Sequence, residues 1–258
     1  MIQTIHRVAQ ILNLFSINKS HLGITEISKQ LNLHKGTVQG LVQALQHEGY
    51  LSKNEETHKY KLGIKIYELG IIFAGSLEIN NKGVDSAHQL AKETEKLVRL
   101  AVLDGYSALV TLDVYPRMVP FFSRQVGPRV PLYCTAMGRA LLAFSKKEDI
   151  QAYIKQETFV QYTQNTKTKK KDLLDNLDLI RRKGYAVNIG ENVPGRAAIA
   201  APIFNREGKP IAALSLVMSP FDISNDEDEN ILSHKVIRTA FDISQKMTFL
   251  PESGPIFM

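Results

Sequence analysis

The stretch LHKGTVQGLVQALQHEGY, residues 33–50, determines how the first part of the chain folds. Its main apolar residues are spaced as on one face of a helix: Val38, Leu41, Val42 and Leu45. Positions i, i+3, i+4 and i+7 lie on one side of an α-helix, so we expect this side to pack inward. Gly49 follows them and is typical of a helix end. The stretch therefore predicts an amphipathic helix that stops near Gly49.

The residues before this stretch predict two further helices. A first helix is indicated by apolar residues at helical spacing: Ile5, Val8, Ile11, Leu12 and Phe15. Gly23 then breaks the chain, and Thr25 is a capping residue for a short second helix that carries Ile27 and Leu31. A tight connection leads from this second helix into the third.

The residues after Gly49 predict a β-hairpin. Residues 50–53 and 59–62 have strand character, and a polar turn separates them. The order helix, helix, turn, helix, β-ribbon is that of a winged helix-turn-helix. A three-helix bundle with a hairpin is the alternative, but the short spacing from Thr25 to Leu45 favours the winged fold. We predict a winged helix-turn-helix DNA-binding domain over residues 1–65.

The side of the third helix opposite its apolar residues is polar. It presents Lys35, Gly36, Thr37, Gln39, Gly40 and Gln43. A glutamine can pair with the adenine edge in the major groove, while Lys35 and Thr37 can reach phosphates or guanine. Gly40 costs the helix about 1 kcal/mol relative to alanine, which a close approach of the helix backbone to DNA can offset. The hairpin adds Lys59 and Lys61, which we expect to point the same way, towards phosphates. A solvent-facing polar stripe is the alternative.

The remainder of the chain predicts a second domain. Helical spacing over residues 66–79 indicates a linker helix, followed by a domain over residues 80–250. In that domain, helices are expected at residues 87–97, 137–144, 147–156, 172–183 and 226–247. Strands are expected at residues 98–103, 108–114, 185–188, 197–204 and 211–218. Strands flanked by helices on this plan favour an α+β fold with an antiparallel sheet.

Composition is that of a globular protein. The chain has 258 residues, 44% of them hydrophobic and 22% charged. No apolar run approaches the ~20 residues of a membrane helix, and the first residues lack the pattern of a secretory signal. We therefore expect a cytoplasmic protein without a membrane partner. The formal net charge of +6 suits an anionic partner, while the four lysines within residues 167–171 indicate a solvated loop.

The sequence lacks the common catalytic and metal-binding motifs. It has no spacing typical of a zinc site, nucleophile elbow, phosphate-binding loop or dinucleotide fingerprint. Its one cysteine, Cys134, excludes an internal disulfide, and its apolar surroundings indicate a packed core residue rather than a catalytic thiol. The acidic run at residues 226–229 suits the positive end of a helix. We expect no enzyme activity, cofactor or metal, and a thiol-dependent enzyme is the weakest alternative.

Several motifs resemble one family over nearly the whole chain. In the first part these are residues 33–41, 48–51 and 60–63. In the second part they are residues 101–105, Val126-Gly127, 131–143, 182–187 and 199–204. In their order and spacing they are similar to the isocitrate lyase regulator (IclR) family of bacterial transcription factors.

The resemblance implies a winged helix-turn-helix for near-palindromic operator DNA and a GAF-like carboxy-terminal domain for a small effector, in many members a carboxylate. It also implies dimers or tetramers, most of which repress transport or catabolic genes. By this resemblance the effector lies near Ala136, Met137, Asn188, Ala198 and Ser215. An effector carboxylate near residues 136 and 137 is physically reasonable, because the amino terminus of a helix attracts anions.

The chain departs from the family pattern at this site. An acidic residue is common where Asn188 stands, a cysteine where Ala198 stands and a second serine where Val217 stands. The loss of one charge and two polar groups favours a less polar or larger effector than a small 2-oxo acid. Gly36 and Gly40 stand where serine and arginine are more usual, so the operator sequence does not carry over.

We therefore expect a homodimeric or homotetrameric transcriptional regulator that represses catabolic or transport genes. Double-stranded operator DNA and a small metabolite are its expected partners. A ligand-sensing protein whose winged helix binds another protein is the alternative. Salt-dependent binding to duplex DNA separates the two hypotheses.

Overall fold

The computed structural model describes residues 2–117 and 129–248. Val126-Gly127 of the family motifs and residues 249–250 of the expected second domain lie outside them. The chain divides into two compact units between Ser76 and Leu77, and each is described by itself.

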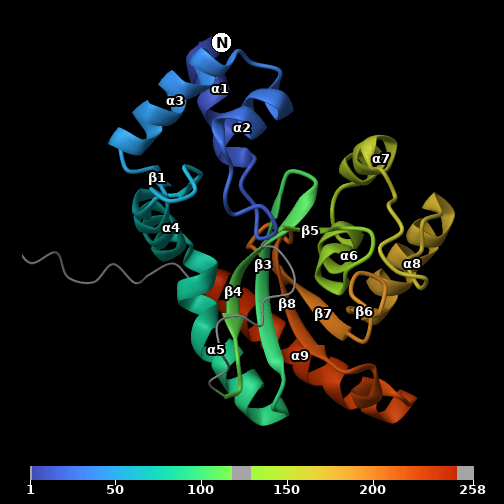
Figure 1. Cartoon of the computed structure of the whole chain (residues 1–258). Coiled ribbons are helices and arrows are strands. Elements are labelled where there is room, and N and C mark those ends of the chain that lie inside the picture. Colours follow the sequence, from blue (N-terminus) through green and yellow to red (C-terminus); the bar gives the residue numbers. More distant parts are fainter. Residues whose placement is uncertain (1, 118–128, 249–258) are drawn as a thin grey trace, which may run out of the picture. The chain divides into compact units, whose positions relative to one another are not determined.

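The first unit is a winged helix-turn-helix, as the sequence predicts (Figure 1). Its elements are α1 (Gln3–Asn13), α2 (Ile24–Leu31), α3 (Lys35–His47), β1 (Leu51–Lys53), β2 (Tyr60–Leu62) and α4 (Ile64–Ser76). β1 and β2 pair antiparallel, and Leu22 adds a backbone bridge to Tyr60 on the free side of β2. That bridge ties the segment before α2 to the hairpin.

One apolar cluster holds this unit together. Val38, Val42 and Leu45 of α3 are buried, as expected, and Leu41 is partly buried. They pack with Ile11 of α1 and other residues of the cluster. Burial of aliphatic side chains stabilises a fold by about 1.5–3 kcal/mol each, so the apolar side of α3 fixes which of its faces remains in solvent.

Two local expectations in this unit are wrong. Gly23, not Thr25, precedes α2: the Glu26 carboxylate accepts a hydrogen bond from the Gly23 N–H at 2.6 Å and so satisfies a donor at the helix start. The helix expected over residues 66–79 is interrupted, because α4 ends at Ser76 and the next helix begins at Glu78. The Ser76 hydroxyl donates to the Phe73 carbonyl at 2.7 Å at this end of α4.

The second unit is built on a six-stranded antiparallel sheet, which confirms the predicted fold class. The strands are β3 (Leu97–Asp104), β4 (Ser107–Val114), β5 (Arg129–Pro131), β6 (Ala186–Ile189), β7 (Ala197–Phe204) and β8 (Pro210–Met218). Their order across the sheet is β5-β4-β3-β8-β7-β6, so β3 and β8 lie at the centre. The helices are α5 (Glu78–Thr94), α6 (Ala136–Ala143), α7 (Lys147–Gln156), α8 (Lys170–Lys183), the short 3-10 helix η2 (Pro220–Ile223) and α9 (Asp226–Thr248).

Three features of this unit differ from the sequence expectations. α5 begins at Glu78 rather than at residue 87, and neither β5 nor η2 was expected. Both unexpected elements are very short, so hydrophobic periodicity could not reveal them. η2 depends on a local capping box instead, in which the Ser219 N–H donates to the Asp222 carboxylate at 2.9 Å.

The sheet has two differently packed faces (Figure 1). α5 and α9 cover one face with a large aliphatic cluster that includes Leu100, Leu214 and Val236. α6 lies against the other face, and α8 packs behind it. The sheet residues in the α6 cluster are mostly alanines: Ala101, Ala108, Ala186, Ala200 and Ala213. Their small side chains let α6 lie close to the strands, and all eight of its residues are buried.

The amino terminus of α6 is held by a tight turn. Thr135 caps the helix, because its hydroxyl accepts the Gly138 N–H at 3.1 Å and donates to the Pro131 carbonyl at 2.7 Å. A Cβ on Gly138 would lie 2.5 Å from the Leu132 Cα and 2.7 Å from its carbonyl oxygen. The position therefore requires glycine because of the close approach of backbone.

We predict opposite effects for two glycine-to-alanine substitutions. Gly138→Ala should lower the free energy of unfolding by about 1–3 kcal/mol, the usual cost of overpacking. Gly40→Ala on the open side of α3 should raise it by about 0.5–1 kcal/mol, since a Cβ added there would have nothing within 4 Å. Urea denaturation followed by circular dichroism measures both. An unchanged stability for Gly138→Ala would contradict the close packing at Leu132.

Candidate functional site

The first candidate site is the solvent face of α3. All six residues predicted to form it are exposed: Lys35, Gly36, Thr37, Gln39, Gly40 and Gln43. Within the part of the chain that the structure describes, the side chains of Lys35, Gln39 and Gln43 have no hydrogen bond or ion pair, so their polar groups are available to a partner. The His34 ring nitrogen Nδ1 accepts the Gly36 N–H at 3.2 Å and caps the helix. The solvent face of α3 is thus polar and contains no acidic residue, and the helix that carries it is capped at its start.

The two hairpin lysines differ in their surroundings. The Lys59 ammonium lies 3.2 Å from a carboxylate oxygen of Glu26 in α2. The Gly23 N–H, and then the Lys59 ammonium, hold the pKa of Glu26 below its ordinary value. Lys61 is exposed and has no ion-pair partner among residues 2–117 and 129–248. A phosphate contact by Lys59 competes with Glu26, whereas Lys61 is free to make one.

The second candidate site is a pocket in the second unit, between the sheet and the start of α6. It has an empty volume of about 490 Å³, including its open mouth. All five residues predicted for an effector site line it: Ala136, Met137, Asn188, Ala198 and Ser215. Its other lining residues are Arg99, Val130, Thr135, Asn192, Val193, Arg196, Ala197 and Val217. The structure therefore brings the predicted residues together and adds two arginines to them.

The sheet register explains why these residues meet. Ser215 on β8 lies opposite Arg99 on β3, and Val217 lies opposite Ala198 on β7. Ala198 in turn pairs with Asn188 on β6. Because alternate residues of a strand face the same side, these positions project from the face that α6 covers. The backbone N–H groups of residues 136 and 137 belong to the first turn of α6 and have no intrahelical acceptor.

Sequence reasoning missed the two arginines of the pocket. Arg99 interrupts the otherwise apolar strand 97–103, which was a usable signal of a functional position. Its Nε lies 3.1 Å from Asp113 Oδ1, and the two side chains are 8% and 5% exposed. Arg196 precedes β7 in a loop and carries no such signal. Burial, and then the neighbouring Arg99 cation, lower the pKa of Arg196 from its ordinary value.

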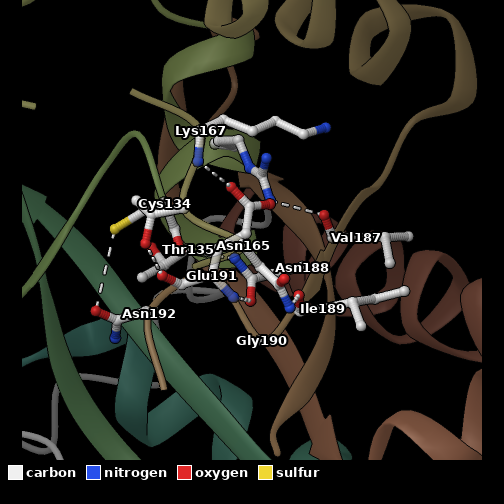
Figure 2. A network of polar contacts seen from close by, with 12 residues as sticks. Cys134, Thr135, Asn165, Lys167, Val187, Asn188, Ile189, Gly190, Glu191 and Asn192 are labelled. Atoms are coloured by element: carbon white, nitrogen blue, oxygen red, sulfur yellow. Dashed lines mark hydrogen bonds and ion pairs between the residues drawn. The ribbon is translucent and has the colours of Figure 1, made fainter. Parts of the chain in front are cut away.

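Asn188 connects the start of α6 to the β6–β7 loop (Figure 2). Its side-chain nitrogen donates to the Cys134 carbonyl at 2.6 Å, and its oxygen accepts the Glu191 N–H at 3.3 Å. The amide is therefore engaged with backbone on both sides. Asn188 shapes the pocket wall through these bonds.

A buried ion pair fixes the same loop from the other side. Arg139 of α6 lies with Nη2 2.7 Å from Glu191 Oε1, and the two side chains are 2% and 7% exposed. The same guanidinium nitrogen donates to the Val187 carbonyl at 2.8 Å. The second Glu191 oxygen accepts the Lys167 N–H at 3.4 Å, as Figure 2 shows. Lys167 of the lysine run thus joins this network through its backbone N–H and not through its charged side chain.

Cys134 is a buried thiol beside the pocket. Its sulfur lies 4.0 Å from the Asn192 side-chain oxygen, and burial raises the pKa of Cys134 to about 12. The thiol is therefore protonated at neutral pH and is a poor nucleophile. No group of three or more metal-ligating side chains occurs in residues 2–117 and 129–248. None of the helices in these ranges is long and apolar enough to cross a membrane.

Comparisons with known proteins agree with this architecture. Residues 4–55 match the IclR helix-turn-helix domain, and residues 74–245 match the carboxy-terminal domain of the bacterial transcriptional regulator IclR. The HTH-type transcriptional regulator XynR of Escherichia coli is 33% identical over 84% of this chain and 86% of its own length.

Two solved structures have the same fold. An IclR transcriptional regulator from Alicyclobacillus acidocaldarius aligns with a TM-score of 0.82 and 25% identity, over 95% of this chain and 98% of that one. An IclR homologue from Microbacterium hydrocarbonoxydans, solved in complex with 4-hydroxybenzoate, aligns with a TM-score of 0.79 and 21% identity. It covers 95% of this chain and 98% of its own.

A winged helix-turn-helix and a sheet domain with a small pocket, carried on one chain, define a DNA-binding regulator that responds to a ligand. The two family matches together span most of the chain. The chain belongs to the IclR family of transcriptional regulators, with a helix-turn-helix domain and an effector-binding domain.

The buried ion pair gives a prediction for stability. Glu191→Gln leaves the Arg139 charge uncompensated and should lower the free energy of unfolding by about 3–5 kcal/mol. Asp104→Asn is the matched control, because the Arg129–Asp104 pair is about half exposed and should cost at most about 1 kcal/mol. Chemical denaturation measures both. Equal effects of the two substitutions would show that Glu191 is not a true buried partner.

Proposed function

We propose that this protein is a cytoplasmic repressor of catabolic or transport genes that binds operator DNA and is controlled by a small metabolite. We assign DNA binding to residues 1–65, a linker role to residues 66–79, and effector binding and assembly to residues 80–250. The single observation that carries the proposal is the polar solvent face of α3, whose glutamines and lysine have no partner among the described residues.

In this proposal α3 lies in the major groove. Gln39 and Gln43 read base edges, since a glutamine can make two hydrogen bonds to adenine. Lys35 and Thr37 contact phosphate or guanine, and Gly36 and Gly40 allow the helix backbone to approach closely. Lys61 contacts the phosphate backbone, and Lys59 does so when it leaves Glu26.

We propose further that the protein acts as a homodimer or homotetramer. Support comes from α4, a helix of 13 residues in which none is buried within its own chain. Its exposed side chains include Ile64, Tyr67, Ile71, Ile72 and Phe73. So large an apolar surface on a helix is typical of an interface, here with a second copy of the chain. A two-fold assembly fits near-palindromic operators with half-sites about one helical turn apart.

The pocket beside α6 is the proposed effector site, formed in part by Ala136, Met137, Asn188, Ala198 and Ser215. The free N–H groups at the start of α6 suit an anionic group. The homologue solved with 4-hydroxybenzoate binds an acid, which supports an acid here too. An effector that binds one arrangement of the dimer more tightly than another shifts the population of DNA-binding states.

We propose no enzyme activity and no bound cofactor or metal. The protonated, buried state of Cys134 argues against thiol catalysis.

Fluorescence anisotropy with a duplex from the region upstream of the gene, against scrambled DNA, tests the DNA-binding proposal. Gln39→Ala should cut the preference for the specific duplex by about 1–3 kcal/mol. Lys35→Ala should weaken binding to both duplexes and lower the salt slope by about one. Gly40→Ala should weaken DNA binding although it stabilises the fold.

Gln151→Ala is the control for these variants, since Gln151 is exposed on α7 of the other unit. It should change neither affinity nor preference. If Gln39→Ala leaves the preference intact, the assignment of α3 to the groove is wrong. If the chain binds no duplex specifically, with or without candidate effectors, the proposal fails and a protein partner for the winged helix is favoured.

A further inference from the structure

The side chains that line the pocket beside α6 include two arginines and no carboxylate, so the lining carries uncompensated positive charge. Arg99 and Arg196 both line it, and Arg99 is paired with Asp113. Arg196 has no ion pair with any described residue. Its guanidinium is partly buried and lies near that of Arg99, and burial followed by Arg99 lowers its pKa. A cation in such surroundings is destabilised until an anion binds beside it.

A second group of donors lies at the start of α6. The N–H groups of Ala136 and Met137 have no acceptor in the described part of the chain, and they carry the partial positive charge of the helix terminus. The Ser215 hydroxyl is a further and independent sign of a ligand. Ser215 is 1% exposed and lines the pocket, and its oxygen has no hydrogen-bond partner. A buried hydroxyl without a partner is destabilising, and a bound acceptor removes that cost.

The two groups of donors come from different elements. Ser215 and the α6 terminus belong to β8 and α6, whereas Arg196 comes from the loop before β7. The pocket is also lined by short apolar side chains, among them Val130, Val193 and Val217. The lining therefore combines two groups of donors for anions with apolar side chains.

We infer that the pocket takes a short-chain dicarboxylate, with one carboxylate at the α6 terminus and Ser215, and the other at the Arg196 guanidinium. Arginine binds a carboxylate through two parallel hydrogen bonds, which gives both affinity and orientation. The apolar side chains contact the carbon chain between the two acids. This inference rests on the proposed effector role and names the chemical class of the effector. It replaces the less polar or larger effector expected from the sequence, because that expectation did not include Arg99 and Arg196 in the pocket.

Isothermal titration calorimetry of the full chain tests the inference with pairs of acids of equal length. The pairs are malonate and propionate, succinate and butyrate, and glutarate and valerate, at constant ionic strength because salt screens charge. We expect at least one dicarboxylate to bind about tenfold or more tightly than its monocarboxylate partner. A second carboxylate on an arginine is a charge-assisted contact of that strength.

Arg196→Gln should remove this preference, so that the two acids of the pair bind within about twofold to threefold of each other. Arg196→Lys should keep part of it, because the charge remains without the paired hydrogen bonds. Arg206→Gln is the matched control: Arg206 is exposed in the β7–β8 turn, and its loss should leave the preference unchanged. Circular dichroism of each variant verifies folding.

The inference is overturned if no dicarboxylate binds, if none is preferred over its partner, or if Arg196→Gln keeps the preference. DNA binding of the same proteins is measured in parallel. Specific DNA binding without dicarboxylate preference overturns this inference and leaves the proposed function standing. Absence of specific DNA binding under all conditions instead contradicts the proposed function itself.

Discussion

The second unit depends on the close packing of α6 against the sheet. Gly138 has no space for a side chain against Leu132, and alanines on the strands allow the helix to lie near the sheet. With all eight residues of α6 buried, its first turn is held at a fixed position by the Thr135 cap. Without this close packing, the free N–H groups at residues 136 and 137 would not face a pocket. The strand residues opposite them would then be part of the hydrophobic core.

The polar network around the pocket positions the loop that carries Arg196. Burying the charge of Arg139 or of Glu191 alone would destabilise the fold, but the two charges compensate each other as an ion pair. The Asn188 side chain adds two hydrogen bonds to the backbone. The loop therefore has one preferred arrangement relative to α6. In the proposed mechanism, a ligand held between α6 and Arg196 contacts both parts, so it can favour one arrangement of the domain over another. This is the physical link that we propose between the pocket and regulation.

Much of the fold could be predicted from the sequence, because long amphipathic patterns such as that of α3 and the apolar strands β7 and β8 are strong signals. Local departures were harder. The start of α2 at Gly23 depends on a hydrogen bond to Glu26, and the break between Ser76 and Glu78 interrupts a stretch that hydrophobic spacing predicts as one helix. The pocket residues followed from family resemblance, since cross-strand neighbours such as Arg99 and Ser215 are far apart in sequence. Arg196 was missed because a charged loop residue carries no periodic signal.

The central claim is that this chain reads DNA sequence as a symmetric assembly. Selection from a pool of random duplexes with the full-length protein tests it most directly. The account predicts enrichment of a near-palindromic sequence whose half-sites are centred about 10 base pairs apart, or a multiple of this. Retention of duplexes without any enriched sequence would contradict it, because binding would then rest on phosphate contacts alone.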